Sequence, residues 1–429
     1  MASFELNLNI QFEEFPIKAS DRIRNLSVIL SNWLAKDSKG KWRHLGLQSS
    51  IQKTVEAGFF TEHEIEYQLE SILSQFTLDH SDALLIWAKR TWDTLSNSET
   101  IRAKYSVTGW IDSRQKQPTV LCLHAGNIPL AGFQDAIVVL MAGFRYRGKL
   151  SRKDPWLLAS LLEELEKNGF AIDSYSTDLK ELKRETVPEA LFFSGSESTI
   201  NRITSLLEEY GQFNTAMEQF WLTRYASGSV AIIESKGLFS EDPSENAIED
   251  LLFACLMYSG RGCRSVSTIL SDISLKEALP LLKRAGEYFK IEDLFSWSDR
   301  EHPTELIRVE AAYGIAKERT QFQFGSVLIV DEPGWSTKPG IIHWIQSDFN
   351  GTIRYLLHHR NKIQSIYLSD RNTLSSQTNE SRYHDHLEEA GFQPEKLSSA
   401  QNPSLDWKPD QVDPFEWLLR QNLIPFFLF

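Results

Sequence analysis

The spacing of apolar residues along the chain changes near residue 118. Before that point, SDRIRNLSVILSNWLAKD (20–37), EHEIEYQLESILSQF (62–76) and SDALLIWAKRTWDTL (81–95) carry apolar residues three and four positions apart. This spacing is typical of amphipathic helices, and Ser20 is a candidate N-cap for the first of them. The sequence therefore predicts a helical segment over residues 1–100.

Beyond residue 118, short apolar runs alternate with helical patterns. Predicted strands include TVLCLHA (119–125), FRYRGKLS (144–151), ALFFSG (190–195), GSVAIIE (228–234), SVSTIL (265–270), FGSVLIVDE (324–332) and IQSIYLSD (363–370). Predicted helices include FQDAIVVLMAG (133–143), DPWLLASLLEELEKNG (154–169), STINRITSLLEEYG (198–211) and ENAIEDLLFACLMYSG (245–260). Such alternation indicates an α/β fold with parallel sheets covered on both faces. The apolar tail LIPFFLF (423–429) is expected to form a strand that docks on a sheet of this subunit or a neighbour.

Composition narrows the classes of function. A chain of 429 residues accommodates two or three domains, and its net charge of −13 argues against a nucleic-acid partner. The three cysteines form no CxxC pair and no zinc-like cluster with histidine, so we expect no metal and a reducing, cytoplasmic location. No signal peptide is evident at the N-terminus. The longest apolar run, AIVVLMAGF (136–144), is too short for a membrane span, which needs about 20 residues.

Three segments of the first half carry polar groups after predicted strands. In HAGNIPL (124–130), the Asn127 amide would stabilise an oxyanion or serve only as a turn residue, and His124 is interpreted as structural. In FFSGSEST (192–199), Gly195 and Ser196 precede a helix whose N–H groups would bind a phosphate, although turn chemistry alone also explains them. The chain contains no GxGxxG fingerprint.

The segment GKLSRKDP (148–155) is basic. Lys149, Arg152 and Lys153 either form a solvated face or, at the carboxyl end of a strand, bind a ribose 2′-phosphate.

A cysteine turn, YSGRGCRSVS (258–267), follows a predicted helix. Cys263 is either a thiolate nucleophile or a small buried apolar residue. Arg261 and Arg264 flank it and would lower the pKa of its thiol if they pointed inward. Cys122 and Cys255 lie within apolar elements and are expected in the core.

Taken in order, these segments resemble the aldehyde dehydrogenase superfamily. That family shows an AGN-P type turn, a K-S element, an F-T/S-G-S turn, a G-x-x-C nucleophile and a late F-G-P-V element. Here they read AGNIPL, GKLSRKDP, FFSGSEST, GRGC and FGSVLIV, spread over about half of the chain. In length and in its helical N-terminal segment the chain looks most like the LuxC-type fatty acyl-CoA reductases.

The resemblance implies a domain organisation. It gives cofactor-binding and catalytic parallel-sheet domains plus an oligomerisation strand. We therefore expect a helical segment (1–100) packing on an NADP-binding domain (101–227), a catalytic domain (228–400), and a C-terminal segment (401–429) with the strand of a homo-oligomer.

The resemblance also implies residue roles. Cys263 matches the nucleophile, Asn127 the oxyanion-stabilising amide, and Lys149 the lysine that contacts the cofactor ribose. Gly195 and Ser196 match the turn under the pyrophosphate. Two further candidate cofactor contacts are Phe324 in the late element and Arg152, which favours NADPH.

Two departures from the family pattern stand out: the first bears on the direction of the reaction, and the second on the cofactor site. The stretch RYASGSV (224–230) lacks the glutamate base that hydrolyses a thioester, and Phe322 replaces a ribose-binding glutamate. The expected activity is NADPH-dependent reduction of a long-chain acyl-CoA or acyl-carrier thioester to a fatty aldehyde, with a possible acyl-transferring partner protein. The alternatives are an oxidative NAD(P)-dependent aldehyde dehydrogenase and a catalytically inactive scaffold subunit.

Overall fold

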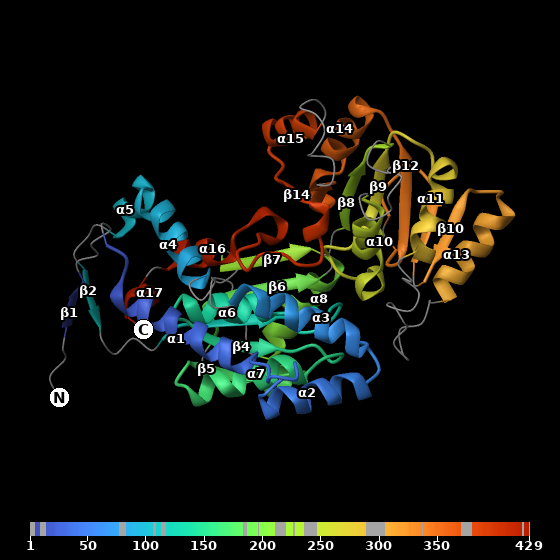
Figure 1. The fold of residues 1–429 in the computed structure, drawn as a ribbon. Helices are drawn as coiled ribbons and strands as arrows, with labels where there is room; N and C mark the ends of the chain where they lie inside the picture. The colour runs from blue at the N-terminus through green and yellow to red at the C-terminus, as the bar shows by residue number, and fades with distance from the viewer. Residues whose placement is uncertain are drawn as a thin grey trace. The chain divides into compact units, whose positions relative to one another are not determined.

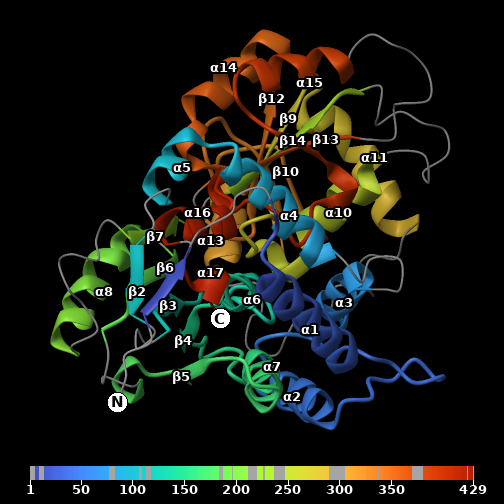
Figure 2. The ribbon, with the colours of Figure 1, turned by 90° about the vertical axis from the view of Figure 1, so that its left-hand side faces the viewer.

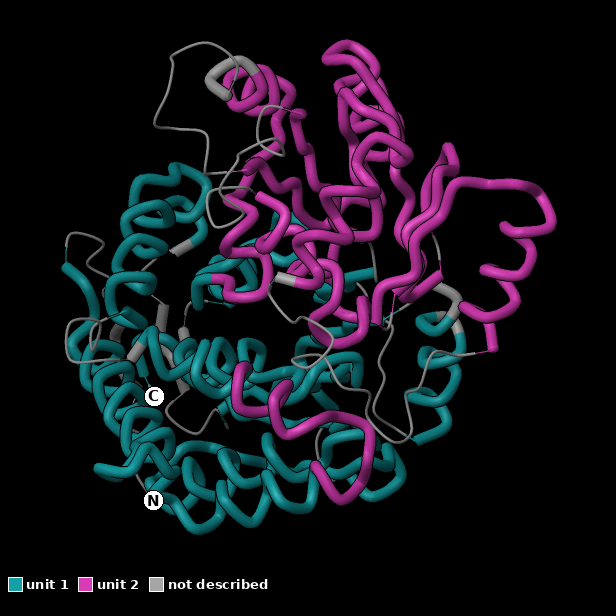
Figure 3. The backbone as a smooth tube through the Cα atoms, turned by 45° about the vertical axis from the view of Figure 1, so that its right-hand side comes forward, with its two compact units in different colours: residues 1–54, 68–225, 404–429 teal, residues 55–67, 226–403 magenta. Residues whose placement is uncertain are grey.

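The computed structural model divides the chain into two compact units (Figure 3). The first comprises residues 1–54, 68–225 and 404–429, and the second residues 55–67 and 226–403. Within them the structure describes residues 5–8, 14–76, 83–105, 109–112, 117–182, 187–195, 197–210, 220–225, 228–235, 247–288, 305–325, 327–336, 338–369, 380–422 and 424–428. The cut after residue 225 lies beside the domain boundary expected at 227, whereas residues 55–67 of the predicted helical segment belong to the second unit.

A five-stranded parallel sheet forms the centre of the first unit. Its strands lie in the order β5-β4-β3-β6-β7, with these bounds: β3 (Thr119–Leu123), β4 (Arg145–Lys149), β5 (Ile172–Ser176), β6 (Ala190–Gly195) and β7 (Trp221–Tyr225). The central strand β3 is buried along its whole length, as its unbroken apolar sequence TVLCL requires. Because the chain moves outward from β3 first through β4 and later through β6, the strand order reverses between β3 and β6.

Helices cover both faces of this sheet (Figure 2). Right-handed crossovers put α6 (Phe133–Met141) and α7 (Trp156–Lys167) on one face, and α8 (Glu197–Glu209) on the other. Under α8 the core contains apolar residues of alternate strand positions and of the helix, namely Leu121, Leu123, Leu191, Phe193, Ile200 and Leu207. The predicted α/β architecture is thus confirmed for this unit.

The N-terminal part of the chain is helical, as expected (Figure 1). Its helices are α1 (Ile17–Trp33), α2 (Leu45–Glu56), α3 (Glu62–Leu73), α4 (Ala83–Ser96) and α5 (Glu99–Tyr105), and the strands β1 (Glu5–Leu8) and β2 (Gly109–Asp112) pair antiparallel. In α1 the residues spaced at helical intervals, Ile23, Leu26, Leu30 and Trp33, are fully buried. The predicted cap was wrong: α1 starts at Ile17, with Pro16 at the N-cap, and Ser20 lies inside the helix.

The apolar tail is a helix rather than the predicted oligomerisation strand. After α16 (Pro414–Gln421), residues Ile424–Leu428 form α17, while residues 423 and 429 lie outside the described part. Phe426 is fully buried, with ring contacts to Phe15, Trp92 and Phe415, all in the first unit. Pro425 has no N–H to give to a sheet, and its fixed φ suits the first turn of a helix.

A seven-stranded sheet forms the centre of the second unit. The strand order is β10-β11-β12-β9-β8-β13-β14, and all neighbours are parallel except the edge pair β10–β11. The strands are β8 (Gly228–Ile233), β9 (Val266–Ser271), β10 (Gln321–Phe324), β11 (Val327–Asp331), β12 (Ile341–Gln346), β13 (Ile363–Leu368) and β14 (Pro394–Lys396).

The helices of the second unit bury its sheet. They are α10 (Ile248–Leu256), α11 (Leu275–Tyr288), α13 (Glu305–Ala316), α14 (Phe349–His358) and α15 (Glu380–Glu389). One core cluster joins Val230, Ile232, Leu270 and Ile366 of the sheet to Leu356 of α14 and to Tyr383 and Leu387 of α15. A smaller one places Ile307 of α13 against Leu328, Val330 and Ile341. Among the described helices, none is both long and apolar enough to cross a membrane.

Candidate active site

Three of the predicted site residues in the first unit share one edge of its sheet. Asn127 lies four residues beyond the end of β3, Lys149 ends β4, and Gly195 ends β6. Because β4 and β6 are the parallel neighbours of β3, the three residues lie at the carboxyl ends of three adjacent strands. In open α/β sheets, ligands bind beyond the carboxyl ends of the strands where the strand order reverses, which here is between β3 and β6.

Hydrogen bonds to a buried carboxylate fix the loop that carries Asn127. The carboxylate of Asp154, which is buried, accepts hydrogen bonds from Leu130 N–H (2.7 Å), Leu157 N–H (3.1 Å) and the Thr54 hydroxyl (3.2 Å). Burial raises the pKa of Asp154, although these hydrogen bonds oppose the rise. Leu130 has a left-handed φ of 55°, a conformation that persists only where its surroundings enforce it. The loop is therefore rigid, and the half-buried Asn127 side chain extends from a fixed backbone.

His124 fixes the other side of the loop. Its ring lies against Gly132, where a Cβ would come within 2.2 Å of Nδ1, so only glycine fits there. Nε2 of His124 is 2.7 Å from the Tyr146 hydroxyl, and Nδ1 is 3.6 Å from Asp135 Oδ2. His124 is thus a structural histidine, as interpreted from the sequence.

A buried ion pair under the loop was not predicted. Arg224 on β7 donates to Asp135 on α6 at 2.6 Å, and both side chains are almost fully buried. Burial alone would raise the pKa of Asp135, but the Arg224 guanidinium and then His124 lower it to about 2. The apolar surroundings of FQDAIVVLM and the isolated charge within β7 were the signals in the sequence.

Lys149 and Arg152 lie on the segment that follows β4. Lys149 is half-buried and Arg152 is exposed. Burial and then the nearby Arg152 charge lower the pKa of Lys149. Two cations that repel each other at the carboxyl edge of a parallel sheet suit an anionic group, because a phosphate would offset both charges. Ser196, the partner of Gly195 in the predicted phosphate turn, lies outside the described residues.

In the second unit, Cys263 lies just before β9, at the amino end of that strand. The 3-10 turn η6 (Met257–Gly260) leads to it from α10, and its residues Tyr258, Ser259 and Gly260 have φ values of 56°, 55° and 66°. Non-glycine residues seldom adopt this region, and such strain concentrates at functional sites. A Cβ at Gly260 would lie 3.2 Å from the Cys255 carbonyl oxygen, a tight contact that favours glycine there.

The three cysteines differ in burial. Cys122 and Cys255 are fully buried, as expected, and burial raises the pKa of both thiols. Cys263 is half-buried. A reactive thiol must be reached by its substrate, so among the three only Cys263 qualifies.

Phe324 ends the edge strand β10, which is separated from β9 by β11 and β12. Its side chain is 6% exposed and packs on Gly286 of α11, where a Cβ would meet the ring at 2.3 Å. This contact gives the Phe324 ring a packing role within the second unit, and its contact with a cofactor remains a prediction.

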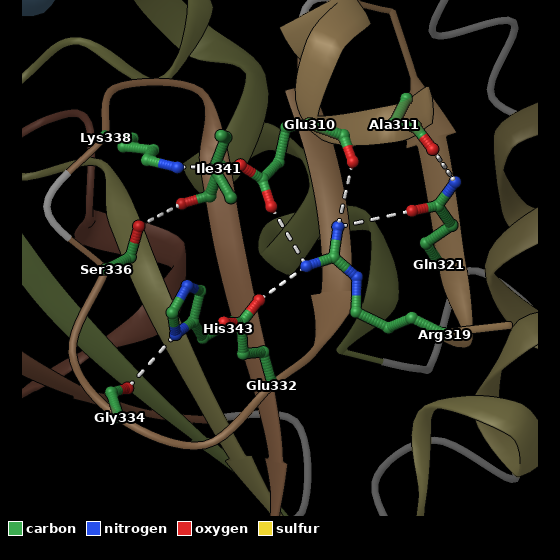
Figure 4. Close-up of polar contacts among 10 residues, drawn as sticks. All are labelled: Glu310, Ala311, Arg319, Gln321, Glu332, Gly334, Ser336, Lys338, Ile341 and His343. Carbon is green, nitrogen blue, oxygen red and sulfur yellow. Dashed lines mark hydrogen bonds and ion pairs between the residues drawn. The ribbon is translucent and has the colours of Figure 1, made fainter. Parts of the chain in front are cut away.

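The start of β10 is fixed by a cluster of charges (Figure 4). Arg319 forms ion pairs with Glu310 of α13 (3.0 Å) and with Glu332, and it donates to Gln321 Oε1 (3.3 Å). Lys338 adds a second cation to Glu310 at 2.7 Å. This network anchors the β10–β11 hairpin to α13 and so sets the position of Phe324.

No model of a protein family matches the sequence, and no curated protein was found to be related to it. Solved structures do resemble the fold. An oxidoreductase from Marinobacter aquaeolei is 11% identical, with a TM-score of 0.57 over 96% of this chain and 87% of that one. Aldehyde dehydrogenase 21 from Physcomitrella patens, in complex with its reaction product succinate, is 12% identical, with a TM-score of 0.53 over 93% and 84%.

An NADP-dependent enzyme from E. coli is also similar, at 14% identity and a TM-score of 0.52, over 89% of this chain and 80% of that one. Similarity at such low identity bears on the fold and not on the reaction. The chain thus has an aldehyde dehydrogenase-like fold, as predicted from its sequence.

Proposed function

We propose that this protein reduces an acyl thioester, either a long-chain acyl-CoA or an acyl-carrier thioester, to a fatty aldehyde with NADPH. The observation that carries the proposal is the cysteine turn, because it presents a half-buried thiol on a strained backbone. The LuxC-type resemblance and the missing glutamate in residues 224–230 support reduction over oxidation.

The carboxyl edge of the first sheet fits a nicotinamide cofactor. The strand order reverses there, α8 begins directly beyond β6 with its N-terminus at this edge, and Lys149 supplies a half-buried cation. In the proposal, Lys149 contacts the cofactor ribose and Arg152 the 2′-phosphate, while Gly195 and Ser196 lie under the pyrophosphate. When bound, NADPH supplies the hydride.

Cys263 performs the covalent chemistry in this proposal. Its thiolate attacks the thioester carbonyl, and the Asn127 amide, with a backbone N–H, stabilises the resulting oxyanion. Collapse of the tetrahedral species expels the coenzyme A thiolate and leaves an acyl group on Cys263. Addition of hydride to that acyl carbon and cleavage of its bond to sulfur release the aldehyde and restore the thiolate.

The carboxylates described around the cysteine turn are paired with arginine side chains. Glu395 accepts from Arg264 at 2.7 and 3.2 Å and from the Ser365 hydroxyl at 2.7 Å, and Glu64 lies 3.9 Å from Arg261. A carboxylate engaged in this way is a poor general base for water. This arrangement supports an acyl-enzyme that survives until it is reduced.

The test is an assay for aldehyde. With palmitoyl-CoA and NADPH, we expect one aldehyde and one free coenzyme A for each NADPH oxidised, and no turnover by Cys263→Ala. If neither palmitoyl-CoA nor the palmitoyl-carrier-protein thioester yields aldehyde, the reductase proposal is wrong.

Aldehyde oxidation is the second candidate, because solved structures of similar fold include a named aldehyde dehydrogenase. It predicts NAD(P)H formation from an aldehyde without coenzyme A. If the protein is a catalytically inactive scaffold, we expect neither thioester reduction nor aldehyde oxidation. An acyl-transferring partner and a homo-oligomer remain predictions, although the tail expected to form the oligomerisation strand is the helix α17.

A further inference from the structure

Directly after Cys263, the side chain of Arg264 turns into the second unit. It is 6% exposed and forms a bidentate pair with Glu395, with Nη2–Oε2 at 2.7 Å and Nη1–Oε1 at 3.2 Å. The remaining donors are also used: Nε donates to Ala400 O (2.7 Å), and Nη2 to Ser399 O (3.2 Å). A guanidinium held by so many acceptors has one orientation.

The same cluster holds the backbone of the cysteine turn. The Tyr367 hydroxyl donates to Arg264 O at 3.1 Å, and the Arg264 guanidinium lies over the Tyr367 ring at 5.5 Å. From β8, the Ser229 hydroxyl donates to Cys263 O at 3.0 Å. These contacts follow immediately on the three left-handed residues of η6, whose strain must be offset by contacts of this kind.

The two charges of the pair act on Cys263 in opposite directions. A nearby guanidinium favours a thiolate, and a carboxylate disfavours it. Burial opposes the charge of Arg264, yet Tyr367, Glu395 and then Cys263 raise its pKa. The titratable and charged groups described around the turn are Arg261 and Tyr258 on the turn itself, Glu64 and Tyr67 of α3, Tyr367 of β13, and Glu395 of β14.

We propose that Arg264 and Glu395 form a charge-compensated clamp that positions the Cys263 turn and sets the field at its sulfur. Both are proposed as positioning residues, because they act on Cys263 through the backbone of the turn and through their charges. The inference rests on the proposed role of Cys263 as nucleophile. Because Glu395 neutralises Arg264, the guanidinium can hold the turn in place while its positive charge acts only partly on the Cys263 sulfur.

The experiment is the pH dependence of Cys263 alkylation by iodoacetamide in the full-length protein. Because the thiolate reacts and the thiol does not, the midpoint of the rate profile reports ionisation of Cys263. Labelling is read at the Cys263 peptide by mass spectrometry, which separates it from the buried Cys122 and Cys255. The assay needs neither cofactor nor acyl substrate.

The clamp predicts shifts of opposite sign in two variants. Glu395→Gln keeps the shape but uncovers the Arg264 charge, so the midpoint falls by about one pH unit and alkylation near neutral pH speeds up about tenfold. Arg264→Met uncovers Glu395 instead, and the midpoint rises by about the same amount. A purely structural role would move both variants in the same direction.

Two further variants guard the interpretation. Glu310→Gln breaks the partly buried Arg319 cluster in the same unit (Figure 4) and should leave the midpoint unchanged. Arg264→Lys keeps the positive charge but loses the planar, bidentate geometry of the guanidinium. It should therefore shift the midpoint less than Arg264→Met does, and it serves as the test if Arg264→Met folds poorly.

Shifts of the same sign in Glu395→Gln and Arg264→Met, or no shift in either, would overturn the clamp. Opposite shifts in a protein that makes no aldehyde would support the clamp and reject the reductase. Aldehyde formation with an unchanged alkylation profile would do the reverse, so the two proposals fail independently.

Discussion

The two units use their parallel sheets in different ways. In the first, Asn127, Lys149 and Gly195 follow the carboxyl ends of adjacent strands, where the strand order reverses. In the second, Cys263 precedes β9 and so lies at the amino end of that strand, on a backbone with three successive left-handed residues. The Asn127 loop has one left-handed non-glycine residue, Leu130, whereas three left-handed residues in succession precede Cys263, so the backbone is more strained at the cysteine turn.

Buried charges support both places, but with different partners. Under the Asn127 loop, Asp135 and Arg224 pair within a network that includes His124. In the second unit, Arg264 of the cysteine turn pairs with Glu395 of β14. Asp135 and Arg224 pack against His124 at the base of the Asn127 loop, whereas Arg264 directly follows Cys263 in the chain. We therefore expect mutations of the first pair to affect stability most, and mutations of the second to affect reactivity most.

The largest expected effect is that of Asp135→Asn. It leaves the Arg224 guanidinium buried without a carboxylate, and removing one partner of a buried pair lowers the free energy of unfolding by about 3–5 kcal/mol. Calorimetry at pH 7 measures this. Glu416→Gln, which breaks an ion pair within α16, is the control and should cost less than about 1 kcal/mol.

The same pair predicts an acid response. Because the folded-state pKa of Asp135 is lowered to about 2, its contribution is complete above the unfolded value of about 4 and is lost as the pH falls through 2. The stability lead of the native protein over Asp135→Asn should therefore shrink between pH 4 and pH 2. A constant difference over that range would contradict the assignment.

Next in size is Phe426→Ala, which tests the tail helix. Removing a fully buried aromatic side chain that contacts Phe15, Trp92 and Phe415 should cost about 3 kcal/mol or more. Phe427→Ala, on the half-buried neighbour, should cost clearly less. Equal losses from the two variants would mean that α17 does not pack as described.

Asn127→Ala addresses the edge of the first sheet. If its amide stabilises the oxyanion, turnover should fall on the order of 100-fold or more with an unchanged melting temperature. Asn168→Ala, an exposed residue before β5 at the opposite edge of the same sheet, is the control and should be silent. Turnover within threefold of the native rate would leave Asn127 as a turn residue.

The smallest effect is expected for Arg152→Ala. Loss of an exposed cation facing a 2′-phosphate should raise KM for NADPH about tenfold and leave KM for NADH unchanged. Lys167→Ala, at the far end of α7, also removes an exposed charge and is the control. A similar rise for both cofactors would remove the basis for an NADPH preference.

Much of the fold could be predicted because its signals are local. The unbroken apolar run TVLCL became the central strand β3, and the helical spacing in residues 20–37 became α1. The tail could not be read correctly, since LIPFFLF has neither a period of two nor one of 3.6, and only Pro425 favoured a helix. Strands such as β5 and β7 were missed because polar residues interrupt them, and their burial depends on distant partners.

The candidate site was predictable only in part. The residue types and their positions at or just after the ends of regular elements pointed to Asn127, Gly195 and Cys263. The buried pair Asp135–Arg224 and the partly buried pair Arg264–Glu395 were not predicted, because their members lie 89 and 131 residues apart in the chain. The motif predicts Phe324 as a cofactor contact, which stays a prediction, while the packing of its ring on Gly286 could not be predicted from the motif.

The most direct test of the central claim is to trap the acyl-enzyme. The protein is mixed with palmitoyl-CoA in the absence of NADPH, the modified residue is located by mass spectrometry, and NADPH is then added. We predict a palmitoyl group on Cys263, absent from Cys263→Ala, that is discharged as aldehyde. No acylation of Cys263, from either palmitoyl-CoA or the palmitoyl-carrier-protein thioester, would contradict its role as the nucleophile.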